Sequence, residues 1–419
     1  MSSHFNGLWR QPDFLKLWAG TTIADVGTQV TVVALPLTAV LVLGAGPMDM
    51  GLLAATGGVP SLVFGVFAGA WADRLPRRPV IIATATIVGL LLGSIPVASI
   101  AGVLRIEWLY AVEFLAGLAG VLAGAAYQAY IPTLVDTPDL HEANTRLEQS
   151  FSVARTIGPG LGGALVQWLT APIAIAVDAV SYFVADLLLL WIRHPEPPVT
   201  RPQGREANIW REMKEGLQFT LADPVLRSLT TAVASATLFN SAFFALYILY
   251  LSRTLEIPPV LLGVVLGVAG PSALVGSLLI GPLNRTFGVG RCLLLCIGVA
   301  AIGRLIVPLA TGPMMVIVVL LIIGEVGRAF FNANFGVTFR TLQQTRTPPE
   351  LRGRVSATMN TMSRGFWPLG SLAGGVLGEY VGIPTTMVLS VIGAAAIGLW
   401  VLWPLRTMDE LPLSREGPA

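Results

Sequence analysis

The sequence predicts an all-α membrane protein with twelve transmembrane helices in two six-helix repeats. Hydrophobic residues make up 54% of the 419 residues and charged residues only 12%, whereas a soluble domain carries about a quarter charged residues. Twelve apolar stretches are each long enough to cross a hydrocarbon core about 30 Å thick. The cations between them fall mainly on one side when the N-terminus is placed in the cytoplasm, as the positive-inside rule requires.

The same patterns order the spans along the chain. Only Arg105 and Arg253 fall in loops that would face outward. Many of the ten Trp lie near span ends, where amphipathic indoles favour the headgroup level. We therefore expect a multi-pass protein of the inner (plasma) membrane with both termini in the cytoplasm. The predicted spans are 14–43, 48–73, 79–102, 107–133, 147–169, 172–192, 225–251, 259–284, 291–311, 313–340, 356–380 and 384–404.

A polar stretch at 193–224 separates the first six spans from the last six. It opens with a proline-rich run that disfavours a helix, then continues as NIWREMKEGLQFTLAD. The second part places apolar residues on one face, which suits a helix at the inner membrane surface. The predicted domains are an N-terminal bundle (1–192), a cytoplasmic linker with an amphipathic helix (193–224) and a C-terminal bundle with a short tail (225–419).

The two halves read as copies of one another. RTIGPGLGG begins at Arg155 and RGFWPLGSLAGG begins at Arg364, and a proline follows the arginine by four residues in both, at Pro159 and Pro368. Two facing six-helix repeats provide the arrangement that alternating access needs.

The loop after the second span carries the most specific motif. It reads GAWADRLPRRPV over 69–80 and resembles the signature loop of the major facilitator superfamily. The matching residues are Gly69, Asp73, Arg74, Arg77 and Arg78, whereas Pro76 stands where that family usually has Gly. The resemblance implies a conformational gate in which Asp73 meets the N-terminal end of the eleventh span, because a carboxylate is favoured at a helix N-terminus. The plainer alternative is that the arginines only anchor the topology.

A second motif lies in the fifth span. Gly158, Pro159, Gly162 and Gly163 match the GPxxGG core of the antiporter motif of exporters in this superfamily. Glycines permit close helix approach, so plain packing explains any one of them. The whole chain is similar to the branch that contains macrolide and enterobactin exporters. This resemblance implies a proton-coupled exporter of amphipathic small molecules, such as drugs or antibiotics, that works by alternating access.

Ionisable residues inside spans are candidates for function because burying a charge there is costly. No His falls in a span, so a proton carrier would have to be a carboxylate. We rank the candidates Asp25, Glu113 and Glu325, in that order. Asp25 has no oppositely charged neighbour in sequence, and Glu113 occupies a position where many drug exporters have Arg. Each has a plainer alternative, a carboxylate that is hydrogen-bonded and inert.

Polar residues around these acids are expected to line a cavity. Glu325, Arg328 and Asn332 share one face of the tenth span, and an ion pair there could be functional or merely fix the rotation of the helix. Gln29 and Asp178 complete the predicted cavity, although Asp178 also suits a packing contact. Bulky apolar or weakly cationic compounds would fit such a lining.

Other classes of function are disfavoured by what the sequence lacks. Cys292 and Cys296 lie one turn apart with no flanking His or acid, so we expect packing thiols and neither a metal nor a cofactor. No GxxxxGK[ST] sequence occurs, which argues against an ATP-driven pump, and no nucleophile–His arrangement suggests an enzyme. The expected partners are the small-molecule substrate, protons and the lipid bilayer, with no nucleic acid, and the chain is expected to be a monomer. The alternatives are a siderophore or lipid exporter of the same fold, or a membrane receptor or scaffold that does not transport.

Overall fold

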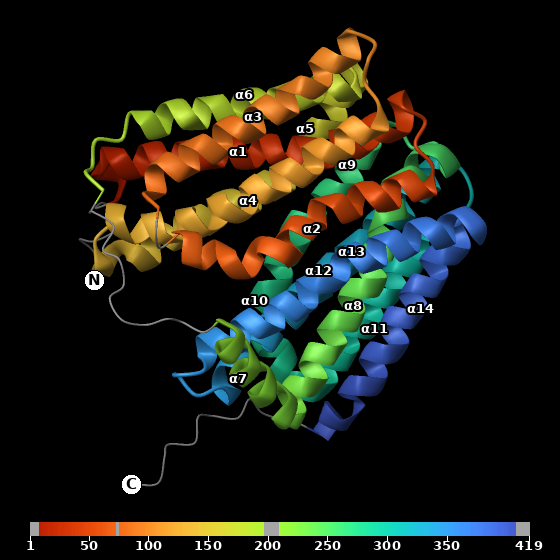
Figure 1. The fold of residues 1–419 in the computed structure, drawn as a ribbon. Coiled ribbons are helices and arrows are strands. Elements are labelled where there is room, and N and C mark those ends of the chain that lie inside the picture. Colours follow the sequence, from red (N-terminus) through yellow and green to blue (C-terminus); the bar gives the residue numbers. More distant parts are fainter. Residues whose placement is uncertain (1–7, 73–74, 197–208, 408–419) are drawn as a thin grey trace. The chain divides into compact units, whose positions relative to one another are not determined.

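The computed structural model describes residues 8–72, 75–196 and 209–407, and these are helical except for short connections. Contacts divide the chain into two units. The first unit comprises Met1–Gln203 and Leu251–Gly267, and the second comprises Gly204–Tyr250 and Val268–Ala419. Figure 1 traces the helices of both units.

The helices of the first unit pack in the order α5, α1, α6, α3, α4, α2, each against the next. The short helix α9 packs against α5. Their bounds are α1 Pro12–Leu37, α2 Pro47–Ala72, α3 Arg77–Ile100, α4 Ile106–Leu134, α5 Leu140–Trp168, α6 Ala171–Leu190 and α9 Pro259–Gly267.

The second unit repeats this order with α13, α8, α14, α11, α12 and α10, and α7 packs against α13. Their bounds are α7 Ile209–Ala222, α8 Pro224–Leu249, α10 Ala269–Phe287, α11 Val289–Leu309, α12 Met314–Arg346, α13 Arg352–Tyr380 and α14 Ile383–Leu402.

The helices of the two units are related by a constant offset in residue number. α1 begins at Pro12 and α8 at Pro224, and both run for 26 residues and continue as a five-residue π-helix. The same offset in residue number separates the starts of α3 and α11, of α5 and α13, and of α6 and α14. It also separates the ends of α4 and α12. The halves therefore share one register, and each residue of a repeat has an equivalent in the other.

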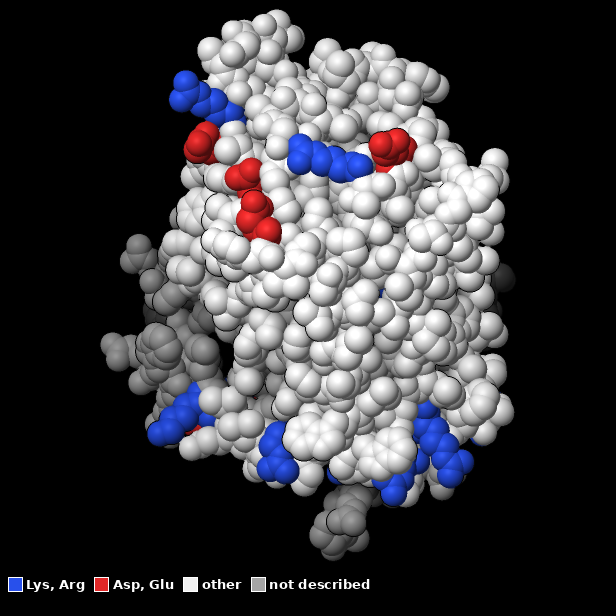
Figure 2. All heavy atoms as spheres, turned by 90° about the vertical axis from the view of Figure 1, so that its right-hand side faces the viewer, with Lys and Arg blue, Asp and Glu red and all other residues white. Residues whose placement is uncertain are grey.

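The long helices have the properties of membrane spans. Ten in the described residues are long and apolar enough to cross a bilayer, with α9 and α10 forming one of them. α5 and α13 are also 29 residues long but more polar. Large apolar side chains face outward, for example Ile100 (79% exposed) and Trp400 (78%). Figure 2 shows a wide uncharged band between charges gathered near the two ends of the face drawn. The predicted fold class is confirmed.

Helix ends depart from the predicted spans where the helix continues beyond the apolar stretch. α5 begins at Leu140 and α12 continues to Arg346, because these polar extensions keep forming helical turns although they are not apolar enough for a span. A helix is also present in the predicted linker, as α7. Contacts place residues 251–267 with the first unit, whereas the predicted boundary puts them in the C-terminal bundle; that boundary stays a prediction.

Candidate functional site: two equivalent cavities

The first unit encloses a cavity of about 850 Å³ among its helices. Its lining includes four carboxylates from four different helices, Asp25 on α1, Glu113 on α4, Glu148 on α5 and Asp178 on α6. None of the described residues that line it is Lys, Arg or His. We call it the acidic cavity. It brings together three predicted site residues, Asp25, Glu113 and Asp178, that are far apart in sequence.

Asp25 and Glu113 have no hydrogen bond or ion pair among the described residues. Glu113 lies against the backbone of α2, where a Cβ at Gly57 would come within 2.7 Å of its Oε2 atom. Glycine at position 57 therefore makes the room that this carboxylate occupies. These two acids therefore lie without a hydrogen-bond donor in a cavity whose lining also includes the hydroxyl groups of Thr28 and Tyr127.

Asp178 differs, because two hydroxyl groups bind it. Thr31 donates to Oδ2 at 2.5 Å, and Ser181 donates to Oδ1 at 3.2 Å. The side chain is 1% exposed, and it lies so close to Gly27 that a Cβ there would meet Oδ1 at 2.5 Å. Asp178 thus combines a place in the cavity lining with the packing contact that the sequence also suggested.

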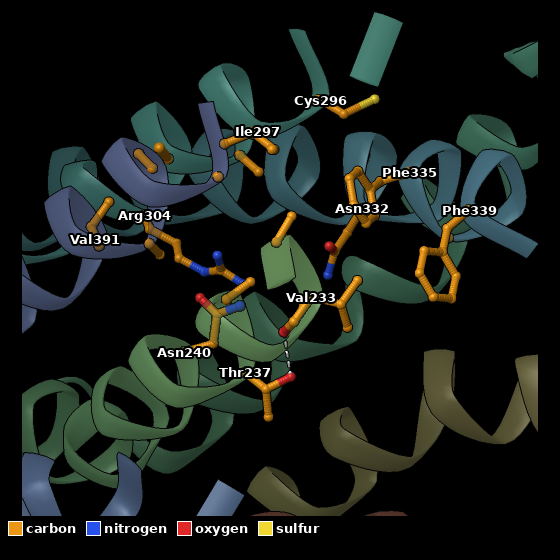
Figure 3. Close-up of a pocket in the computed structure, with 18 of the residues that line it drawn as sticks. Val233, Thr237, Asn240, Cys296, Ile297, Arg304, Asn332, Phe335, Phe339 and Val391 are labelled. Carbon is orange, nitrogen blue, oxygen red and sulfur yellow. Dashed lines mark hydrogen bonds between the residues drawn. The ribbon is translucent and has the colours of Figure 1, made fainter. Parts of the chain in front are cut away.

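The second unit contains a pocket of about 390 Å³ with the opposite character. Its lining includes Arg304 and Arg340, three asparagines and two phenylalanines, but no acid among the described residues. Figure 3 shows the guanidinium of Arg304 pointing to the side chain of Asn240 on α8, with Asn332 on α12 also directed inward. We call it the arginine pocket.

The predicted ion pair on α12 is formed in the second unit. Arg328 donates from Nε to Oε2 of Glu325 at 2.8 Å and from Nη2 to Oε1. Glu325 is 8% exposed, so the pair is buried. Asn332, on the same helix, lines the arginine pocket, whereas Glu325 and Arg328 do not.

The two cavities occupy equivalent places in the two repeats. Asp25 is the fourteenth residue of α1 and Thr237 the fourteenth of α8. Leu92 and Arg304 are the sixteenth residues of α3 and α11, and both line their cavities. By the same register Glu148 corresponds to Asn360, and Gln128 corresponds to Arg340. The duplicated cavity has therefore acquired acids in one copy and arginines in the other.

Glu113 and Glu325 are also equivalent, since each lies the same number of residues before the end of its helix, α4 or α12. Glu325 has Arg328 one turn later, whereas the equivalent position after Glu113 is Ala116. The residue equivalent to Gly57 is Ala269. One carboxylate is therefore paired on its own helix, and the other lies unpaired against a glycine of α2.

Only part of the predicted gate is described. Asp73 and Arg74 lie outside the described residues, and Gly69 is in α2. Backbone N–H groups of Arg77 and Arg78 donate to the two carboxylate oxygens of Glu196 at 2.6 and 3.2 Å, and this satisfies the first turn of α3. The guanidinium of Arg78 donates to the carbonyls of Leu189 and Leu190 at the end of α6, so it ties two helices together.

The glycine motif of α5 packs closely against two neighbours. Gly158 lies on Gln29 and Val26 of α1, Gly162 lies on Val30, and Gly163 faces the backbone of α9 at Pro259. Gln29 thus contacts the motif and is not among the residues that line the acidic cavity. Pro159 is inside the helix.

The structure corrects the alignment of this motif between the halves. The sequence comparison paired Pro159 with Pro368, but the equivalent of Gly158 is Gly370. Gly370 lies on Leu238 and Ser241 of α8, and these two residues are equivalent to Val26 and Gln29. The repeated feature is the close glycine crossing and not the proline, whose kink does not need a fixed position.

Sequence reasoning missed Glu148 and Arg304 as site residues. Asn144, Glu148 and Phe151 recur at helical spacing on α5, and all three line the acidic cavity; that period was the available signal. Arg304 stands in an apolar run with no acid within four residues on either side, which is costly for a spanning helix. Among the described residues no group of His, Cys, Asp and Glu is placed to hold a metal ion, and Cys292 and Cys296 are buried free thiols.

Two six-helix repeats of helices long and apolar enough to span a membrane, each with charged side chains in an internal cavity, are typical of a membrane transporter. The chain belongs to the major facilitator superfamily: residues 2–416 match the family described as transmembrane secretion effector. It is 26% identical to the multidrug efflux pump Tap of Mycolicibacterium fortuitum, over 97% of this chain and 98% of that protein. It is also 26% identical to the uncharacterized MFS-type transporter YfiS of Bacillus subtilis, over 94% of this chain and 93% of that protein.

Solved structures share the fold at lower identity. A mutant of the nucleoside transporter NupG superposes with a TM-score of 0.74 at 13% identity and covers 95% of this chain and 100% of that chain. An inward-facing, occupied bacterial homologue of the human lysosomal transporter Spinster gives a TM-score of 0.71 at 16% identity, covering 97% and 98%. These likenesses concern the fold.

Proposed function

We propose that this transporter is a proton-coupled exporter of amphipathic small molecules that works by alternating access. The observation that supports it best is the acidic cavity, in which Asp25 and Glu113 have no cationic or hydrogen-bonding partner among the described residues. A coupling group must bind a proton in one facing state and release it in the other. An acid without a fixed partner is free to do both.

The contacts rank the carboxylates as proton carriers. Asp178 accepts a hydrogen bond from the Thr31 hydroxyl, which stabilises its charged form, and the Ser181 hydroxyl lies 3.2 Å from its other oxygen. Glu325 is held by Arg328, and this pair would have to break before the acid could take up a proton. Asp25 and Glu113 need no such rearrangement. Asp25 ranks first because Glu148 of the same cavity adds a like charge, and like charges favour protonation of one member.

The lining of the acidic cavity suits an amphipathic substrate. Its lining contains leucine, valine and isoleucine side chains together with two tyrosines and the carboxylates, as in sites that bind apolar molecules through a few oriented polar groups. The name of the Tap relatives, multidrug efflux pump, agrees with a drug or antibiotic as substrate. A siderophore or lipid exporter of the same fold is the second candidate, and a receptor or scaffold that does not transport is the third.

Gradient-driven uptake in vesicles tests the coupling. The full chain, purified as a monomer and reconstituted, would be given a pH gradient and a fluorescent amphipathic dye chosen by a susceptibility screen in a pump-deficient host. We expect Asp25→Asn to exchange dye at equilibrium but not to accumulate it, because the amide keeps the shape and cannot titrate. Asp49→Asn on α2, outside the cavity, is the matched control. Full accumulation of dye by Asp25→Asn would assign the role of proton carrier to Glu113. If the wild-type chain leaves the dye equally distributed across the vesicle membrane, the result would favour a receptor that does not transport.

Orientation in the inner membrane is tested separately. Both termini and residues 193–224 are proposed to be cytoplasmic. Cysteines introduced at exposed Arg105 and Glu350 should behave oppositely in intact cells, with only Arg105→Cys open to an impermeant thiol reagent. Labelling of Glu350→Cys alone would reverse the orientation.

A further inference from the structure

The guanidinium of Arg304 is buried without a partner. The side chain is 8% exposed, and its Nε atom has no hydrogen-bond acceptor. The structure gives it no ion pair among the described residues, and its guanidinium carbon lies 5.7 Å from the centre of the Phe244 ring. An arginine cannot lose its charge at working pH, so burying it alone is costly unless something else supplies the counter-charge.

The nearby acid, Glu325, forms its ion pair with Arg328 and none with Arg304. Both carboxylate oxygens of Glu325 already accept from Arg328. Arg328 lies over the same Phe244 ring, also at 5.7 Å, so two guanidinium groups share one ring and one carboxylate. The cluster therefore carries an excess of one positive charge, and Arg340 adds a second cation to the lining of the pocket.

The fold itself does not require this arginine. Leu92 occupies the equivalent position of the first unit and lines the acidic cavity. A residue that is apolar in one copy and a buried, unpaired cation in the other serves something other than packing.

The rest of the arginine pocket has donors and an apolar wall. Figure 3 shows Asn240 and Asn332 directed to the space beside Arg304, with Phe335 and Phe339 along α12. Neither asparagine side chain has a hydrogen bond to another described residue. Guanidinium and amide N–H groups together match the acceptors of a carboxylate, phosphate or sulfonate, while the aromatic rings suit an apolar body.

From this geometry we infer that the arginine pocket binds an amphipathic organic anion, with its oxyanion on Arg304 and Asn240 and its apolar part against Phe335 and Phe339. The bound anion supplies the missing counter-charge. That this anion is the transported molecule rests on the proposed function; the binding itself does not. An organic acid and an anionic phospholipid headgroup present the same chemistry, and the test separates them.

Binding is measured on the purified full chain in a non-ionic detergent, without a proton gradient, so the loss of coupling would not affect the result. The probes are 2-naphthoate and 2-naphthamide, which share one ring system and differ in charge, and anionic phosphatidylglycerol against zwitterionic phosphatidylcholine. We expect naphthoate to bind about tenfold to a hundredfold more tightly than the amide, the range for a hydrogen bond to a charged group. Calorimetry and thermal shift report the affinities.

Arg304→Met should abolish this preference and melt at or above the wild-type temperature, because it removes a buried charge that lacks a partner. Arg304→Lys keeps a charge and should retain part of the preference. Arg364→Met, an exposed arginine on α13 of the same unit, is the matched control and should keep all of it.

Two results would support the inference, and they differ in the source of the bound anion. Naphthoate selectivity that depends on Arg304 identifies an organic acid, and phosphatidylglycerol selectivity alone that depends on Arg304 identifies a lipid headgroup. A lower melting temperature for Arg304→Met together with unchanged anion selectivity would overturn the inference and leave Arg304 a structural residue. Equal binding of all four probes to the wild-type chain would overturn it as well.

Discussion

The acidic cavity and the arginine pocket occupy equivalent places in the two repeats, and they differ in volume, about 850 Å³ against about 390 Å³, and in the charge of their lining. Aligned positions carry Asp25 against Thr237 and Leu92 against Arg304, on helices that begin and pack in the same order. The same arrangement of helices therefore accommodates a cavity lined by acids and a pocket lined by arginines. The chemical character of each cavity therefore resides in single side chains at equivalent positions, so exchanging them tests each assignment directly.

The largest effect is expected where equivalent glutamates differ in pairing. Glu325→Ala should lower the stability of the protein by about 3–5 kcal/mol, because it leaves Arg328 buried without a carboxylate. Glu113→Ala, the equivalent substitution in the first unit, should lower the stability by less than about 1 kcal/mol, because Glu113 forms no ion pair whose cation would lose its counter-charge. Thermal unfolding in detergent measures both.

Arg328→Ala completes this comparison. It should be milder than Glu325→Ala, because a lone carboxylate can take up a proton and become neutral whereas a guanidinium cannot. Equal melting of all three variants would show that the environments of the two glutamates do not differ as the contacts indicate.

A charge transplant should break the contrast between the cavities. Leu92→Arg copies the arginine of the second unit into the acidic cavity, where it would pair with the free carboxylates. We expect gradient-driven accumulation to fall by about 5- to 150-fold, the range of a typical coupling free energy, while equilibrium exchange of dye survives. Leu92→Met is the volume control. Normal accumulation by Leu92→Arg would mean that the acids of this cavity do not carry the proton.

Alanine substitutions at the glycines where α5 and α13 pack closely against neighbouring helices should have the next largest effect on stability. Gly370→Ala places a methyl group against the backbone of α8 at Leu238, and overpacking of this kind typically costs about 1–3 kcal/mol. Gly158→Ala meets the Cβ atom of Gln29 on α1, which the backbone holds in place, so its cost should fall in the same range. Gly160→Ala has open space and should melt like the wild-type chain. A ranking by melting temperature that puts Gly160→Ala lowest would contradict the described crossings.

The smallest effect is expected at the glycine that accommodates Glu113. Gly57→Ala makes the first unit resemble the second, which has Ala269 there, and forces the carboxylate away from α2. We expect less than about 1 kcal/mol of destabilisation, in line with a small shift of a flexible side chain, together with slower transport. Unchanged transport would indicate that the position of Glu113 does not matter for the cycle.

The sequence predicted the fold and several members of the site, because both leave periodic or costly signals. Span length and the distribution of arginines are enforced by the bilayer, so the twelve helices could be located to within several residues. Asp25 and Glu113 were noticed because an acid in an apolar helix is expensive. Their meeting in one cavity could not be predicted, since it depends on the neighbour order of α1, α3, α4 and α6.

The residues that were missed have a physical reason in common. Glu148 is the second residue of the predicted fifth span, 147–169, where a carboxylate near the end of a span is not unusual. Arg304 was seen as one more arginine, and only the structure shows that Glu325 is already taken by Arg328. Partner choice is a tertiary property. The gate around Asp73 remains a prediction, because that residue lies outside the described residues.

The shared register of the two halves has a consequence for the history of the protein. Because α1, α3, α5 and α6 start at one constant displacement from α8, α11, α13 and α14, neither copy has gained or lost residues between those helix starts since they separated. The opposite charges of the cavities then require only substitutions of single residues and no change in the spacing of these helices. An ancestral half, associating with an identical copy, would have carried one kind of cavity twice, and specialisation needed only a few point changes within helices of unchanged register.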